Sequence, residues 1–136
     1  MTRRRGTNAI EFSLLMPVFV IAVMALIDLS WLSFRQGAAQ DAVQRGCRDA
    51  SLVDPGRGEA DVAALLDAAR AAIKAEYDAD GCDTCEIDAA LTGTVPYRAV
   101  ECSLEADHFG LTPFFGGARR FGSQATMRLE YQRRSQ

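Results

Sequence analysis

An uncharged apolar run near the N-terminus constrains this chain more than any other feature of its sequence. Residues 12–27 contain no Asp, Glu, Lys or Arg, and apolar side chains continue beyond Asp28 through Trp31 to Phe34. An α-helix over Phe12–Phe34 is roughly 34 Å long, which exceeds the bilayer hydrocarbon thickness of about 30 Å. The run therefore predicts a membrane-spanning helix.

The residues that flank the run predict its orientation and its length. Basic residues occupy positions 3–5, and basic residues next to a span stay in the cytoplasm. Pro17 removes one helix hydrogen bond and permits a kink. Helix-forming residues continue after the span until Asp54-Pro55-Gly56. We therefore expect one long helix over about residues 8–52, with the rest of the chain in the periplasm.

The pattern downstream of that helix predicts a small α+β domain. Residues 58–78 carry apolar side chains at i, i+3, i+4 and i+7, which indicates a second, amphipathic helix. Three later segments alternate apolar and polar residues, as half-buried antiparallel strands do: 85–91, 98–107 and 123–132. The order of two helices followed by three strands predicts an α+β fold.

A phenylalanine-rich segment, residues 108–121, links the last two expected strands. Two interpretations of this segment stay open. It folds back over the sheet and completes the core, or it presents an apolar patch to another protein.

The cysteines point to an oxidising compartment. All four follow the apolar run: Cys47, Cys82, Cys85 and Cys102. An even number beyond a membrane signal fits disulfides. Cys102 lies on the inward side of its expected strand, within reach of Cys47 or Cys85, and we favour Cys47–Cys102 with Cys82–Cys85. The C-x-x-C pair follows a helix rather than opening one, which argues against redox chemistry.

Composition and motifs exclude several classes of function. The net charge of −3 leaves an acidic body, which argues against nucleic-acid binding. The only histidine, His108, has no partner pattern for a metal site or a nucleophilic triad, and no glycine-rich phosphate loop is present. We therefore predict that the protein is not an enzyme and uses no cofactor, no metal and no small-molecule substrate.

Three interpretations of the N-terminus compete. A secretory signal cut near Gly37 needs a small-residue cleavage site, but Arg35 and Gln36 stand just before the best one. A plain uncleaved anchor explains the apolar run but leaves Gly6 and Glu11 unexplained. The third interpretation is a leader that is cut after Gly6 while the helix is retained.

The third interpretation rests on a resemblance. The pattern Gly6-Thr7-Asn8-Ala9-Ile10-Glu11-Phe12 resembles the site cut by prepilin peptidase, where cleavage follows the glycine. The block over residues 3–35, with Pro17 inside the run and Asp28 near its end, resembles the TadE/TadG-like family. Members of that family are minor pilins, or pseudopilins, of the tight-adherence (Flp-type) pilus system.

This resemblance implies an organisation and a set of partners. Residues 1–6 are the leader, residues 7–34 the transmembrane part of the first helix, and residues 35–136 a periplasmic, pilin-like α+β domain. The expected partners are the inner membrane, prepilin peptidase, and other pilins and assembly proteins that meet the N-terminal helix. The alternative from a different class is an uncleaved, single-pass anchored periplasmic binding or sensor domain.

Four residues are expected to act in the membrane or in assembly: Glu11, Phe12, Pro17 and Asp28. Glu11 either pairs with the amine that cleavage frees at Thr7, within or between subunits, or lies at headgroup level near the positive end of the helix dipole. Asp28 is either exposed at the periplasmic interface or placed in a helix–helix contact.

Overall fold

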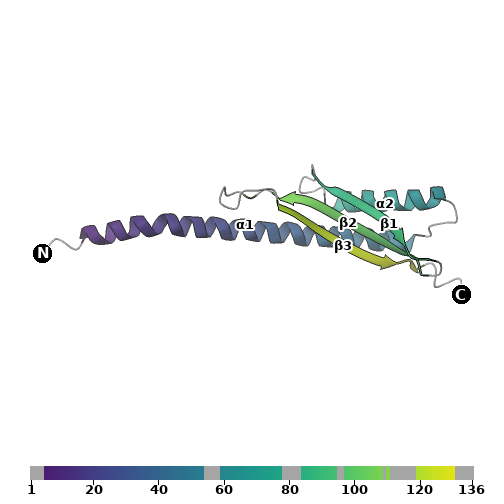
Figure 1. Cartoon of the computed structure of the whole chain (residues 1–136), viewed down its shortest axis with the longest axis horizontal. Helices are drawn as coiled ribbons and strands as arrows, with labels where there is room; N and C mark the ends of the chain where they lie inside the picture. Colours follow the sequence, from purple (N-terminus) through teal and green to yellow (C-terminus); the bar gives the residue numbers. More distant parts are fainter. Residues whose placement is uncertain are drawn as a thin grey trace.

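The computed structural model describes residues 5–53, 59–77, 84–94, 97–108, 110 and 119–130. Its elements in chain order are α1 (Arg5–Leu52), α2 (Glu59–Tyr77), β1 (Glu86–Thr92), β2 (Ala99–His108) and β3 (Arg119–Arg128). Helix α1 is a long rod, and α2 and the sheet lie along its C-terminal half (Figure 1). The predicted α+β fold with a long N-terminal helix, a second helix and a small antiparallel sheet is confirmed.

Helix α1 is continuous over 48 residues and runs through Pro17 without interruption. The serines in its apolar half bond to the helix itself. The Ser13 hydroxyl donates to the Ile10 carbonyl at 2.9 Å, and Ser30 and Ser33 donate to carbonyls one turn earlier. These bonds satisfy hydroxyl groups that would otherwise be costly to place in hydrocarbon.

The sheet has the strand order β1-β2-β3, and both pairs are antiparallel. In the register, Cys102 of the central strand lies opposite Ala89 on one side and Ala125 on the other. Helix α1 packs against β2 and β3, and α2 packs against β1. Both helices therefore cover the same face of the sheet. The opposite face carries polar side chains, among which Arg120 bridges Glu86 and Glu105.

The third strand differs from the expectation by four residues. It begins at Arg119 and ends at Arg128, whereas the alternation had indicated 123–132. The ladder with β2 continues to the pair His108↔Arg119, so Arg119 and its neighbours belong to the sheet rather than to a loop. The inward parity is as expected: Phe121 and Leu129 are buried.

The structure therefore decides only in part between the two interpretations of the phenylalanine-rich segment. Phe121 belongs to the core. The other large apolar residues of the segment lie outside the described residues: Phe109, Leu111, Phe114 and Phe115. Tyr131, which was expected on the inward side of the last strand, also lies outside them. The choice between a folded-back loop and an exposed patch stays open for these positions.

The core lies between the C-terminal half of α1, α2 and the inner face of the sheet. Its largest fully buried side chains include Ile73, Leu104, Leu129 and Val43. Gly46 allows α2 to approach α1 closely, because a Cβ at this position would overlap Cγ1 of Ile73. A disulfide between Cys47 and Cys102 joins α1 to the central strand, with a Cα–Cα distance of 5.8 Å.

An ion pair at the surface connects α2 to β1. Arg70 donates to Asp88 at 2.9 Å and to the Ala89 carbonyl at 3.0 Å. The hydrogen bond from Arg70 lowers the pKa of the Asp88 carboxyl, and a bond from the Ala89 N–H acts in the same direction. Both charged groups are exposed, so the pair orients α2 more than it stabilises the fold.

Candidate functional site

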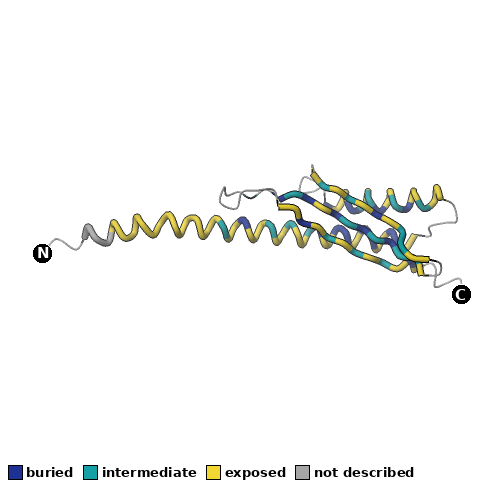
Figure 2. The backbone as a smooth tube through the Cα atoms, viewed as in Figure 1, coloured by how far each residue is buried: buried dark blue, intermediate teal, exposed yellow. Residues whose placement is uncertain are grey.

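The N-terminal half of α1 presents apolar side chains to all sides. Residues 9–24 are exposed around the whole helix (Figure 2). The body of the protein is the part formed by the C-terminal half of α1, α2 and the sheet. The helix contains an 18-residue window with a mean hydropathy of 2.5, and no residue of that window is buried against the body. Within the described part of the chain, this is one helix that is long and apolar enough to cross a membrane. It fits a single-pass membrane anchor.

The predicted processing site lies at the start of this helix. The backbone is helical from Arg5 onward, so Gly6 and Thr7 both belong to α1. Glu11 stands four residues after Thr7, a spacing that places two helix positions on the same face. Glu11 and Phe12 are both exposed. Glu11 therefore stands one turn from the amine that cleavage after Gly6 would create.

The body first meets α1 at Ala25. From there a stripe of positions three or four residues apart faces the body, as one side of a helix does: Ala25, Asp28, Leu32, Arg35 and Ala39. Arg35 places its guanidinium carbon 5.9 Å from the centre of the Phe121 ring, a cation–π contact with β3. The last ten residues of the expected span are thus partly covered by protein.

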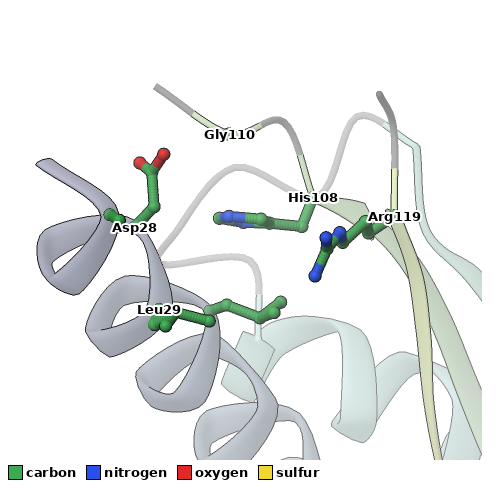
Figure 3. A pocket seen from close by; sticks show the side chains of 7 residues that line it. Asp28, Leu29, His108, Gly110 and Arg119 are labelled. Carbon is green, nitrogen blue, oxygen red and sulfur yellow. The ribbon is translucent and has the colours of Figure 1, made fainter. Parts of the chain in front are cut away.

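A small cavity marks the point where the sheet ends against α1 (Figure 3). Its volume is about 20 Å³, room for roughly one water molecule. It is lined by Ala25, Asp28, Leu29, Leu32, His108, Gly110 and Arg119. Apolar helix side chains and polar groups from the ends of β2 and β3 therefore face the same space.

The structure bears on one of the two interpretations that the sequence left open for Asp28. Asp28 is only 6% exposed, so the expected exposure at the periplasmic interface is wrong. Asp28 lines the same cavity as His108 and Arg119, from the ends of β2 and β3, and a contact with the helix of another subunit stays a prediction. His108 is also buried, and its Nδ1 has no hydrogen-bond partner among the described residues.

One clue to this arrangement was present in the alternation of β2. Residues 100, 102, 104 and 106 point inward along the strand, and His108 continues that series. The alternation therefore indicated that the only histidine faces the core. Nothing local in the sequence indicated that it would line the same cavity as Asp28, because 80 positions separate the two residues.

The opposite face of the same α1 segment is open. A shallow apolar groove runs along it, lined by Val23, Leu26, Ile27, Ser30, Trp31 and Phe34. The rings of Trp31 and Phe34 stack with their centres 5.7 Å apart. Residues 25–34 thus have one face on the body and one apolar face available to lipid or protein.

The structure joins Cys47 to Cys102, which is the pairing that the sequence favours. Cys85 is also disulfide-bonded, whereas Cys82 lies outside the described residues. No group of three or more His, Cys, Asp or Glu residues in the described ranges is arranged to hold a metal ion.

Comparison with known proteins bears on the helix and not on the body. Residues 6–48 match the family of TadE-like proteins. Neither a curated protein nor a solved structure matches the chain. The matched segment begins at Gly6 and ends one residue beyond Cys47. It therefore covers the apolar half of α1 and most of the half that packs against α2 and the sheet. The resemblance to the TadE-like family is confirmed over these residues.

Proposed function

We propose that this TadE-like chain is a minor pilin or pseudopilin that the inner membrane supplies to a tight-adherence pilus or to its assembly machinery. The family match associates the chain with that pilus system. The observation that carries the finer proposal is the long apolar rod attached to a small disulfide-bonded body. Such a helix needs an apolar environment along residues 9–24, which lipid provides before assembly and neighbouring helices provide afterwards.

The proposed mechanism is physical rather than chemical. The TadE-like, pilus-associated family is structural rather than catalytic. In a membrane, apolar helices associate through close packing and through polar groups that find partners. Exposed large side chains along the rod supply the packing surface, and Glu11 supplies the polar group.

Charge and disulfides support a periplasmic body. Arginines at positions 3–5 precede the span, and such residues favour the cytoplasmic side. The Cys47–Cys102 bond lies beyond the span and needs an oxidising compartment. The two features agree on an orientation with the N-terminus inside and the body outside the inner membrane.

Processing after Gly6 is tested by the mass of the mature chain purified from membranes. We expect an N-terminus at Thr7, and we expect Gly6→Val to leave the chain uncleaved at full membrane level. Gly37→Ala is the matched control, because a Cβ at Gly37 has nothing within 4 Å and this residue lies far from the site. An intact Met1 in the parent protein would support the uncleaved anchor, and a start near Gln40 would support a discarded signal.

Glu11 is tested in cells by its replacement with alanine. If the carboxylate pairs with the Thr7 amine in an apolar environment, its removal leaves a charge whose burial costs about 3–5 kcal/mol. We expect pilus assembly to fall by roughly tenfold or more while the protein remains at normal level in the membrane. Glu59→Ala, which removes an exposed carboxylate from α2, serves as the control. Normal piliation in the Glu11 variant would contradict an assembly role.

A further inference from the structure

The two edges of the sheet differ in how their backbone groups are satisfied. An edge strand presents N–H and C=O groups that a further strand can bind. The edge strands here are β1 and β3. At β1 one such pair of groups is already occupied, because the Ala89 N–H donates to Asp88 Oδ1 at 2.8 Å and the Ala89 carbonyl accepts from Arg70 at 3.0 Å.

The path of the Arg70 side chain shows that these bonds lie at the free edge of β1. Arg70 belongs to α2, which packs on the inner face of the sheet, whereas the exposed Asp88 alternates with the buried Ala89 and so lies on the outer face. Because β2 occupies the other side of β1, Arg70 reaches Asp88 around the free edge. Ala89 is the middle residue of this seven-residue strand. Side chains therefore block the centre of the β1 edge.

The edge of β3 has no such cover. The Leu129 N–H donates to the Arg98 carbonyl at 3.2 Å, and in an antiparallel ladder such pairs alternate with pairs whose backbone groups point away from the partner strand. The even-numbered residues of β3 therefore direct their backbone groups to the outer edge: Arg120, Gly122, Gln124, Thr126 and Arg128. Among the described residues, no group outside the strand bonds to them.

The centre of β3 also lacks the features by which proteins protect an edge, which include charges, proline and bulges. The strand is ten residues long, and its register with β2 continues without a break. Residues 122–127 contain no charged residue and no proline. The sheet is thus blocked at β1 and open along β3.

A second copy of this chain does not fit the open edge. Strand β3 runs in the same direction as α1 (Figure 1). Antiparallel pairing of β3 with β3 of a second copy would therefore point the two rods in opposite directions, which copies anchored in one membrane with one topology cannot do. Pairing with β1 of a second copy would keep the rods aligned, but Arg70 and Asp88 block that edge.

The charges on β3 indicate what kind of segment fits it. Arg119 and Arg128 stand at the two ends of the strand, roughly 30 Å apart, and both are exposed. Among the described residues neither is in an ion pair, whereas Arg120 pairs with two glutamates. Arg128 lies over the ring of Tyr97, a contact that leaves its charge without a counterion. The edge therefore complements an extended segment that has a carboxylate near each end and no charge between.

We propose that β3 is a docking edge that binds such a segment of a different protein as a fourth strand, with its carboxylates against Arg119 and Arg128. Main-chain hydrogen bonds to the outward groups of β3 provide the attachment, and the two arginines provide selectivity. Because β1 is blocked, the sheet grows at one edge only. The inference does not rest on a role in a pilus or on processing after Gly6.

The test uses the full chain in micelles and amide exchange measured residue by residue by NMR. The probe is a synthetic peptide of alternating threonine and valine with an aspartate at each end, as long as β3. In the free protein the outward amides of Gly122, Gln124 and Thr126 should exchange fast. Those of Ser123 and Ala125, which face β2, should exchange slowly. At a peptide concentration about ten times its dissociation constant, the outward amides should slow roughly tenfold.

Two control peptides separate the parts of the proposal. One carries lysine in place of both aspartates and should protect the outward amides severalfold less at the same concentration. The other is methylated on alternate backbone nitrogens, on the side that would face β3, and should not protect them. Equal protection by the lysine peptide would overturn the selectivity, and protection by the methylated peptide would overturn strand addition.

A pair of variants tests the edge from the side of the protein. Gln124→Pro removes one outward N–H, a change that edge strands tolerate, and should abolish protection by the aspartate peptide. Gln124→Ala loses the same side chain and should respond as the parent does. Slow amide exchange throughout β2 shows that each variant has kept its fold. Protection of Gln124→Pro equal to that of the parent would overturn the docking edge.

Other occupants of the edge would appear without any peptide. Outward amides that already exchange slowly at every protein concentration would show that the chain covers β3 itself. Outward amides that slow as the protein concentration rises would show that a second copy binds there. Either result would overturn the proposal.

Discussion

Replacing Cys47 and Cys102 together by alanine is expected to lower the free energy of unfolding of the body by roughly 4 kcal/mol. The bond closes a loop of 55 residues, and most of its effect is to restrict the unfolded chain. Both residues are fully buried, so the substitution also removes two sulfur atoms from the core. The measurement is a denaturant titration of the purified protein in micelles, with unfolding monitored by circular dichroism.

The control for this prediction is the Cys82→Ala/Cys85→Ala variant. On the pairing that the sequence favours, that bond closes only a short loop, and its removal should cost much less. A loss below about 1 kcal/mol in the Cys47/Cys102 variant would show that packing alone holds α1 to the sheet. Reduction of the parent protein should reproduce the effect of the double substitution.

Gly46→Ala is expected to destabilise the body by roughly 1–2 kcal/mol, although alanine is the better helix former. The new methyl group would overlap Cγ1 of Ile73 and lie 3.2 Å from the backbone nitrogen of the same residue. Ile73 is fully buried, so it has little freedom to move aside. Separating α1 from α2 would relieve the overlap, but it would loosen the core around both helices.

The matched control is Gly37→Ala on the same helix. With open space around its Cβ, it should stabilise the helix by up to about 1 kcal/mol. The opposite signs of the two glycine substitutions are the sharpest part of this prediction, and both are measured as shifts of the denaturant midpoint. A neutral or stabilising Gly46→Ala would mean that the two helices are not in close contact at this point.

Local signals in the sequence were enough to predict where the two helices lie. Helix α1 was expected over about 8–52 and ends at Leu52, because no strong breaker lies between the apolar span and Asp54-Pro55-Gly56. Helix α2 was found through its apolar period and its acidic first turn. In both cases the deciding interactions lie within a few residues, and these are the interactions that a sequence pattern records.

Long-range pairing explains what the sequence did not indicate. Two arginines at the start of β3 resemble loop residues, yet the ladder with β2 includes both of them, and Arg120 pairs with Glu86 and Glu105 from the other strands. Asp28 resembles an interfacial residue in the sequence, but in the structure it is buried and lines a cavity with residues from the ends of β2 and β3. The membrane residues Gly6, Thr7 and Glu11 stay predictions, because their role depends on a peptidase and on neighbouring subunits.

The Cys47–Cys102 bond has a mechanical consequence. Any pull on the rod travels along α1, past its contacts at residues 25–35, to the segment that carries Cys47. From there a covalent bond passes the load to the middle of β2, the central strand, rather than to an edge. Both neighbouring strands then share the load as shear across their ladders of hydrogen bonds. A body attached in this way bears a pull on its helix without being peeled apart strand by strand.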